Sequence, residues 1–317
     1  MDIIGTLLWP IKWVIELILV AFHSLWTAIG MDPNAGITWV LSIVGLVIVV
    51  RAALIPIFVR QIKSQRKMLE VAPELKKIQE KYKGKKDQFS REAMSRETME
   101  LYKKAGTNPM SSCLPLLIQM PIFFGLFSVL SEAQKGNAGV GPMNLALAKS
   151  FADASLFNIA PLHMSFQSAM EAKPQQVVVM LIAAAMVVLM TASQFITQLQ
   201  IVSKNMSEET KASPTFRQQR ILLYILPLVF AFSGFAFPIG VMFYWLVSNA
   251  WTMVQQFIVI RNMPTPGSQA AKQREERLAR RGKLVSKDVP VVEIEEKKPT
   301  QRQQPVSKTR AKKKPGK

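Results

Sequence analysis

The sequence predicts an all-α integral membrane protein with five core transmembrane helices, an N-terminal interfacial helix and a cytoplasmic helical hairpin. Two observations lead to this fold class. First, 49% of the 317 residues are hydrophobic, and they gather in long apolar runs. A helix of about 20 apolar residues spans a hydrocarbon core of about 30 Å. Second, strongly basic segments alternate along the chain with neutral or acidic ones, as loops on opposite sides of a membrane do.

Residues 1–36 are predicted to hold an amphipathic helix, at 9–29, that lies in the outer membrane interface. At 100° per residue, its polar side chains fall within about 60° of one another and form one narrow stripe. They are Lys12, Glu16, His23 and Thr27. An uncleaved signal anchor that crosses the membrane fits the same residues. Charge counts do not separate the two alternatives, because both leave the next polar segment in the cytoplasm.

Five apolar runs are predicted to cross the membrane. The fourth run has only 17 residues and ends where Pro238 and Gly240 predict a turn. A helix of that length is about 25 Å long, which is short for a bilayer and favours local thinning of the membrane. The predicted spans are residues 37–59, 109–131, 175–200, 221–237 and 239–260.

The two longest connections between spans have opposite character. Residues 60–108 are strongly charged and predict a cytoplasmic hairpin of two helices, 61–83 and 88–105, with weakly apolar faces. Residues 132–174 predict an outer loop with an amphipathic patch near 151–159, to which no chemistry can be assigned.

The chain ends in a basic segment. Residues 261–317 contain no Phe, Trp or Tyr after Asn262 and are rich in Lys, Arg, Gln and Pro, so they predict a disordered tail with a short helix at 268–283. Such a tail can bind ribosomal RNA or anionic lipid through its charge. The candidate contact residues are Arg280, Arg281, Lys312, Lys313 and Lys314.

Charge also orients the chain. The hairpin carries a net charge of +7, the loop at residues 201–220 carries +2 and the tail carries +11, whereas the outer loop is neutral. The positive-inside rule therefore predicts that the hairpin, the 201–220 loop and the C-terminus are cytoplasmic.

Arg51 is the residue on which the functional hypothesis depends. It lies in the first span, about 12 Å from the inner end of the run at Val59. A charge in lipid costs about 2.5–3.5 kcal/mol on insertion scales. The five spans contain no Asp, Glu, His or Lys, so no other span can supply an ion-pair partner. We therefore expect a wet pocket at membrane depth that receives polar or acidic parts of another chain; a snorkelling arginine without a role is the alternative.

Several classes of function are disfavoured by what the sequence lacks. It has no phosphate loop, nucleotide fingerprint or nucleophile elbow, so we expect neither an enzyme nor a bound cofactor. The single cysteine, Cys113, excludes an internal disulfide framework, and His23 and His163 are interpreted as interfacial polar residues rather than metal ligands. An ion-coupled transporter is disfavoured because it would need titratable groups at the midplane, and the predicted spans contain no Asp, Glu, His or Lys. A ribosome-anchoring membrane protein, with the tail as its whole function, stays open as an alternative.

Four stretches, in this order, resemble the YidC insertase family and its mitochondrial Oxa relatives, in the form without the large periplasmic domain. The first is ALIPIFVRQIKSQRKM, directly after Arg51. The others are APELKKIQEKYK in the hairpin, AGTNPMSSCLPLLIQMPIFFGLF at the second span and FPIGVMFYWLVSNAWTMVQQ at the fifth. The resemblance covers about residues 9–260.

The resemblance implies a fold and a function. The fold is five core spans around a hydrophilic groove, and the function is insertion and folding of nascent membrane proteins, alone or with the Sec translocon. It implies that Arg51 is the arginine of the groove and that Gln119 and Trp245 match family motifs, with Gln194 as a further match in the third span. The implied protein is a monomer of the cell membrane, and its tail resembles those of members that contact ribosomes.

Overall fold

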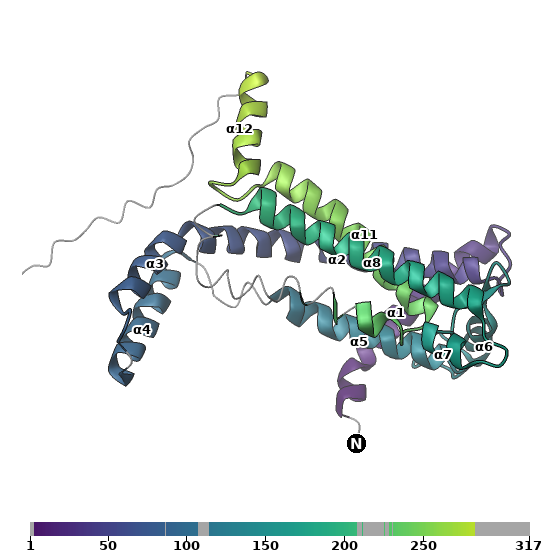
Figure 1. The fold of residues 1–317 in the computed structure, drawn as a ribbon. Coiled ribbons are helices and arrows are strands. Elements are labelled where there is room, and N and C mark those ends of the chain that lie inside the picture. The colour runs from purple at the N-terminus through teal and green to yellow at the C-terminus, as the bar shows by residue number, and fades with distance from the viewer. Residues whose placement is uncertain are drawn as a thin grey trace, which may run out of the picture. The chain divides into compact units, whose positions relative to one another are not determined.

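The protein was analysed as a computed structural model. The structure describes residues 3–85, 87–106, 114–207, 211, 225, 228, 229 and 231–282. Most of these residues are helical, and the helices are long (Figure 1). The helices of the N-terminal half are α1 (Ile3–Ala28), α2 (Gly36–Glu70), α3 (Ala72–Lys81), α4 (Gln88–Lys104) and α5 (Leu114–Gln134). Those of the C-terminal half are α6 (Leu145–Asp153), α7 (Phe166–Glu171), α8 (Val177–Asn205), α11 (Ile239–Asn262) and α12 (Gln269–Arg280).

Within the described residues, four helices are long and apolar enough to cross a membrane. They contain Gly5–Ala28, Gly36–Ser64, Leu117–Gln134 and Val177–Asn205. The all-α membrane fold predicted from the sequence is confirmed. The N-terminal segment meets the criterion by length and composition, so a spanning and an interfacial α1 both stay open. Of the predicted span 221–237, the structure describes residues 225, 228, 229 and 231–237, and its crossing of the membrane stays a prediction.

The fifth predicted span, 239–260, coincides with α11. This helix is not among the four, and its crossing of the membrane stays a prediction. It packs along α8 and α2, and the three helices run side by side in Figure 1.

Large apolar side chains fill the centre of the helix bundle. Trp39 from α2, Leu130 from α5 and Met242 from α11 are fully buried, together with Leu19 from α1 and Phe151 from α6. In a bilayer, lipid tails are as apolar as these side chains, so close packing rather than water exclusion selects this arrangement.

The first span and the hairpin divide at a different place from the one predicted. We expected a separate helix at 61–83, but α2 continues to Glu70 and α3 begins at Ala72. Pro73 explains the break, because its ring has no N–H to donate and would clash with the preceding helical turn. The periodic apolar residues of 61–83 are compatible with one helix, so the pattern alone hid the interruption.

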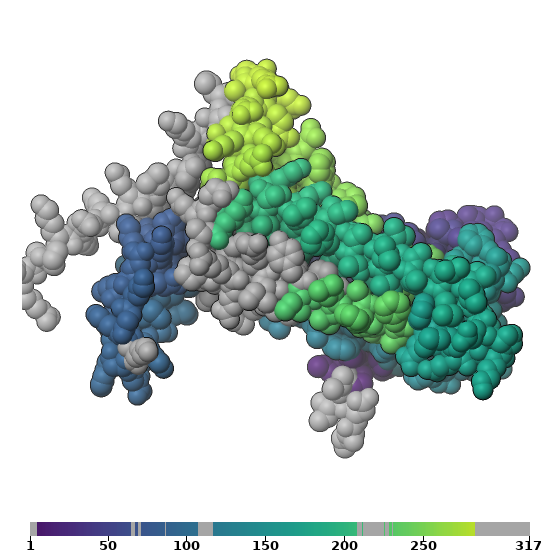
Figure 2. Space-filling model, viewed as in Figure 1, coloured from purple at the N-terminus to yellow at the C-terminus, as the bar shows by residue number. Residues whose placement is uncertain are grey.

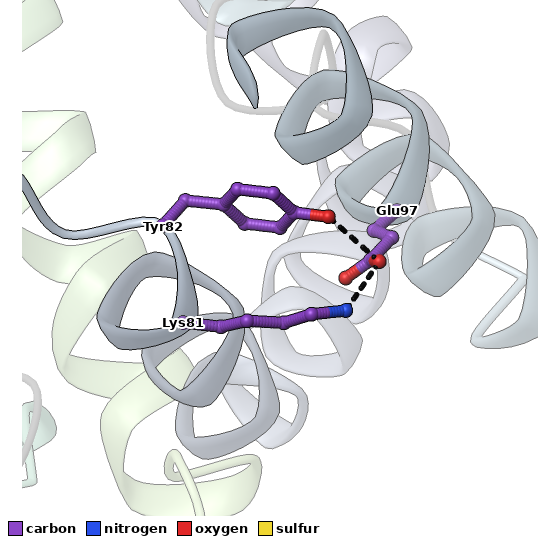
Figure 3. Close-up of polar contacts among 3 residues, drawn as sticks. All are labelled: Lys81, Tyr82 and Glu97. Carbon is purple, nitrogen blue, oxygen red and sulfur yellow. Dashed lines mark hydrogen bonds and ion pairs between the residues drawn. The ribbon is translucent and has the colours of Figure 1, made fainter. Parts of the chain in front are cut away.

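One carboxylate links the two helices of the predicted hairpin, α3 and α4. Glu97 on α4 accepts hydrogen bonds from the Lys81 ammonium group at 2.6 Å and from the Tyr82 hydroxyl at 2.9 Å (Figure 3). These contacts lower the pKa of Glu97 and raise the pKa of Lys81. The Asp87 side chain caps the start of α4 by accepting from the Ser90 N–H at 2.8 Å.

Two residues of the polar stripe of α1, Glu16 and His23, are packed against other parts of the protein. Glu16 is buried and accepts hydrogen bonds from the backbone N–H groups of Val140, at 2.9 Å, and Gly141, at 2.7 Å. His23 is also buried; it bonds to the Pro33 carbonyl at 2.9 Å and stacks on Trp39. A backbone carbonyl therefore satisfies His23 inside the protein, and its position at the membrane interface stays a prediction.

Residues 132–174, called the outer segment after the side that the sequence predicts for them, are more ordered than a loop. It contains α6, α7 and two short antiparallel strands, β1 (Ser155–Leu156) and β2 (Ala160–Pro161). The amphipathic patch predicted near 151–159 forms the end of α6 and the β1–β2 hairpin. Helix α7 packs on α8, and Figure 2 shows the side chains of this part as a continuous teal surface.

The segment after α11 is attached to the end of α8. The Thr265 N–H donates to the Asn205 side chain at 2.9 Å, and both Thr265 and Ser268 are buried. Ser268 then accepts from the Ala271 N–H at 3.2 Å at the start of α12. The helix predicted at 268–283 is therefore present as Gln269–Arg280.

Candidate functional site

Arg51 lies on the face of α2 that packs against α11. Its guanidinium donates a hydrogen bond to the hydroxyl of Ser248. The side chain is partly buried between the two helices. The predicted spans contain no acidic residue that could pair with this charge, and in the structure the polar partner of Arg51 is the Ser248 hydroxyl.

A second hydrogen bond brings a third helix to the same place. Tyr244 lies one helical turn before Ser248 on α11 and is 4% exposed. Its hydroxyl accepts from the side-chain amide of Gln119, on α5, at 3.1 Å. Arg51, Gln119, Tyr244 and Ser248 are called the Arg51 cluster below. Two of its members, Arg51 and Gln119, were candidates from the sequence.

Tyr244 and Ser248 were missed as site residues, although their sequence carried a signal. Residues four apart share one face of a helix, so Tyr244 and Ser248 must point the same way from α11. A hydroxyl pair at that spacing, in a span facing a lone arginine, could have identified both residues.

The charge of Arg51 has no carboxylate partner within the described parts of the chain. The ion pairs found there lie elsewhere, in the hairpin and at the C-terminal end of α5: Lys76–Glu80, Lys81–Glu97 and Lys135–Glu132. A hydroxyl can orient a guanidinium but cannot neutralise it. The cluster therefore presents an uncompensated positive charge. The described residues contain no group of His, Cys, Asp and Glu side chains that could hold a metal ion.

Trp245 points away from the cluster on α11, because successive residues of a helix are 100° apart. Its ring stacks on Phe123 of α5, with 5.5 Å between ring centroids, and meets Phe237 edge-on at 4.7 Å. Phe127 of α5 extends this group by contact with both phenylalanines. Trp245 thus fixes α11 against α5, and a direct role in contacting another chain stays a prediction.

Gln194 is partly buried on α8 and makes no hydrogen bond with the residues that the structure describes. The nearest polar link between α8 and α11 runs from the Asn249 amide to the Met190 carbonyl, at 3.4 Å. No described contact joins Gln194 to the Arg51 cluster, so its role in a groove stays a prediction.

The predicted basic contacts of the tail are only partly described. Arg280 is the last residue of α12, Arg281 follows it, and both are exposed. Lys312, Lys313 and Lys314 lie outside the described residues. The tail's role in binding a ribosome or anionic lipid therefore stays a prediction.

Comparison with known proteins gives the chain a family. A model of the 60Kd inner membrane protein family matches residues 30–266. The chain is 46% identical over 315 residues to a protein of Tropheryma whipplei (strain Twist), covering 98% of this chain and 97% of that one. It is 37% identical over 327 residues to a protein of Bifidobacterium longum, covering 96% and 95%.

A third relative, from Streptomyces avermitilis, is 45% identical over 273 residues, which are 85% of this chain and 61% of that protein. All three relatives carry the name Membrane protein insertase YidC. The family match spans the Arg51 cluster and the helices that carry it. The chain is a multi-pass cell-membrane protein that belongs to the 60Kd inner membrane protein family, the family of YidC and Oxa proteins.

Proposed function

We propose that this protein inserts nascent membrane proteins into the cell membrane and assists their folding, and that the Arg51 cluster receives the polar flank of each client. Membership of the family and the insertase names of its relatives support the insertion activity. The observation that carries the role of the cluster is the bond from Arg51 to the uncharged Ser248. A cation with only a hydroxyl partner attracts an acidic or polar segment.

The proposed step uses no nucleotide. The flank of a client enters from the cytoplasm, where Arg51 attracts it and Gln119 and Gln194 offer hydrogen bonds. The client's apolar segment then moves into lipid. Burial at about 25 cal/mol per Å² of apolar surface gives tens of kcal/mol for a whole helix, which is enough to drive the transfer.

The proposal extends to orientation and partners. The C-terminus and the hairpin are cytoplasmic, as the charge asymmetry favours. The basic tail contacts the ribosome or anionic lipid through Arg280, Arg281 and the lysines at 312–314. The protein acts as a monomer, alone or beside the Sec translocon.

The test is insertion of a short Sec-independent client with an acidic outer tail into liposomes that contain the purified protein. Arg51→Ala should lower the yield about tenfold or more, because about 1.4 kcal/mol of lost attraction corresponds to a factor of ten. Arg51→Lys should keep most of the yield, since the charge remains.

Equal yields from the wild type, Arg51→Ala and Arg51→Lys would leave insertion standing and remove the electrostatic role of Arg51. Absence of insertion with folded wild-type protein would contradict autonomous insertion, and would favour Sec-dependent action or ribosome anchoring. Uptake of a solute that depends on an ion gradient would favour the transporter alternative.

A further inference from the structure

The tip of the β1–β2 hairpin is an exposed apolar surface that the proposed function does not use. Phe157 is 74% exposed and Ile159 is 55% exposed, and they flank Asn158 in the turn between the strands. Ala154–Leu162 contains no charged residue. An exposed apolar tip without charge indicates a contact surface, because such side chains gain by leaving water.

The backbone of the tip is strained at an aromatic residue. The Ile159 N–H donates to the Leu156 carbonyl at 3.0 Å, and both central residues of this turn have positive φ: 51° at Phe157 and 59° at Asn158. Asn and Gly suit such positions, whereas a bulky aromatic side chain does not. Phe157 therefore occupies its position at a cost to folding, and its ring is left outside the protein.

The hairpin is rooted where α2 begins. Ser155 forms a bridge with Ala35, the residue before α2. The backbones approach so closely that a Cβ on Gly36 would lie 2.5 Å from the Ser155 carbonyl carbon. Polar residues precede this point, at Asp32 and Asn34, and the apolar run of α2 starts at Ile37. The root of the hairpin thus lies at the level where α2 leaves water for lipid.

A second root fixes the same level independently. The carbonyl of Leu162, just after β2, accepts from the Gly240 N–H at 2.9 Å in the first turn of α11. The Met164 carbonyl accepts from the Ile239 N–H at 2.9 Å. Two membrane-directed helices therefore hold the hairpin at their outer ends, and Phe157 is only two residues from Ser155.

From this placement we infer that Phe157 and Ile159 insert into the outer leaflet of the bilayer, at the boundary between headgroups and acyl chains. The lipid surface is the occupant because the tip begins two residues after the Ala35–Ser155 bridge, and Ile37, two residues after Ala35 at the start of the apolar run, is itself exposed. Aromatic and apolar side chains anchor proteins at this depth. The hairpin then fixes how deep the outer ends of α2 and α11 sit, whatever the protein does with its clients.

The test measures the depth of one residue in the full-length protein. Cys113, the only cysteine, is replaced by serine, and Phe157→Cys is labelled with an environment-sensitive fluorophore. Single chains are placed in lipid nanodiscs, which excludes a second copy. Lys149→Cys is the matched control, since Lys149 is exposed on α6 of the same outer segment. We expect nitroxide groups on the lipids to quench the label at 157 severalfold more than the label at 149, and aqueous iodide to do the reverse.

A label at 157 that iodide reaches as well as the label at 149, or that neither quencher reaches, would overturn the inference. Phe157→Asn provides a second measurement that is independent of labelling this site. Asn suits positive φ, so the variant should unfold at a higher temperature, while lipid quenching of a label at Ile159→Cys should fall. Unchanged quenching at 159 would contradict a role for Phe157 as an anchor.

Discussion

Arg51 combines two requirements that usually exclude each other in a membrane. A guanidinium at that depth needs polar contacts to be tolerated, yet a carboxylate partner would cancel its charge. The hydroxyl of Ser248 satisfies a donor and leaves the charge in place. The cluster therefore depends on the hydroxyl for its structure and on Arg51 for its attraction.

This division of roles predicts that Ser248→Ala separates stability from activity. The variant leaves the guanidinium without its partner, so thermal unfolding in detergent should show a loss of about 1–3 kcal/mol. Client insertion, measured at a temperature where the variant stays folded, should remain within severalfold of the wild type because the charge is unchanged.

Ser193→Ala is the matched control for Ser248→Ala. Its hydroxyl donates only to the Met190 carbonyl of its own helix, at 2.9 Å, so the loss should be well under 1 kcal/mol. If both serine variants were equally stable, the bond between Arg51 and Ser248 would have no structural role.

Glu16 gives a prediction for the contact between α1 and the loop at Val140 and Gly141. Its two oxygens each accept one backbone N–H, so Glu16→Gln turns one acceptor into a donor that faces another donor. The unfolding free energy should fall by about 1–3 kcal/mol, measured by thermal melting in detergent.

Glu132→Gln is the control for Glu16→Gln. The Glu132 carboxylate lies near the end of α5, but it is exposed and pairs with Lys135. An exposed pair contributes about 0–1 kcal/mol. A Glu16→Gln variant that melts no earlier than the Glu132→Gln variant would show that the buried carboxylate is dispensable.

The sequence predicted some of these residues and not others for physical reasons. Arg51 was identifiable because charge is rare in apolar runs, and Gln119 because it is the only amide in its span. The partners of Glu16 were not identifiable. They are backbone N–H groups of a glycine-containing loop more than 120 residues away, and any residue other than proline carries such a donor.

At the scale of helices, close packing of α1 on α2 depends on Gly45. A Cβ at this position would lie 2.5 Å from the ring of Phe22, closer than side chains allow. Gly45→Ala should therefore push the helices apart and lower the unfolding free energy by about 1–3 kcal/mol, as overpacking does.

Gly240→Ala is the matched control in another helix. Its Cβ would meet the Phe151 ring at 3.4 Å, which is ordinary contact, and alanine favours helix. Gly45→Ala should lower the melting temperature, whereas Gly240→Ala should leave it unchanged or raise it. Equal destabilisation would mean that loss of glycine, rather than contact with Phe22, is responsible.

The Lys81–Glu97 pair should contribute to docking of α3 on α4 only within a window of pH. Because the folded pKa of Glu97 is lowered, its contribution is present above the unfolded pKa and is lost as pH falls through the folded value. Because the pKa of Lys81 is raised, its contribution is complete below the unfolded pKa and is lost as pH rises through the folded value.

Spin labels on α3 and α4 would measure this docking as a distance. The distance should broaden at acid pH in the wild type, and Glu97→Gln should show the broad distribution at neutral pH as well. Glu74→Gln, on α3, should behave as the wild type does. An acid transition that survives in Glu97→Gln would assign the pH dependence to another group.

Helix existence was predicted more reliably than helix limits. Apolar runs identify α2, α5 and α8 because the length of a span is set by the bilayer. The ends of helices depend on single residues such as Pro73, and on whether the chain beyond the apolar run stays helical. The apolar periodicity of 61–83 is the same whether the segment is one helix or the end of α2 followed by α3.

At the scale of the whole molecule, the structure changes where the tail should be cut. Thr265 and Ser268 are buried, and the Thr265 N–H donates to Asn205, so the segment after α11 is part of the folded protein up to α12. Truncation after Gly282 should keep the melting temperature and most insertion of a Sec-independent client, while truncation after Asn262 should lower the melting temperature by several degrees.

The same two truncations test the role of the tail. Removal of residues 283–317 should weaken cosedimentation with ribosomes, with a steep salt dependence in the wild type that becomes shallower. If insertion vanished together with ribosome binding, the ribosome-anchor alternative would replace insertion as the main function. If ribosome binding were unchanged, the basic tail would not be the contact.

The order and character of the segments were predictable from composition, whereas the architecture of the outer segment was not. Residues 132–174 carry no long periodicity, so two short helices and two-residue strands could not be distinguished from a loop. Their arrangement is imposed by contacts with α1, α2, α8 and α11, which a local pattern does not encode.

One consequence follows from Pro56, which lies inside α2 between Arg51 and the C-terminal end of the helix. A proline lacks the N–H that would bond the preceding turn, so α2 bends most easily there. Glu70 lies 14 residues beyond Pro56, or about 21 Å, and Arg51 five residues before it, or about 7.5 Å. A rotation of about 10° at this pivot therefore displaces Glu70 by about 4 Å and Arg51 by only about 1 Å. The part of α2 that ends at Glu70 can therefore move while Arg51 stays nearly still. Distance measurements on both sides of Pro56, in the wild type and in Pro56→Ala, would show whether this motion depends on the proline.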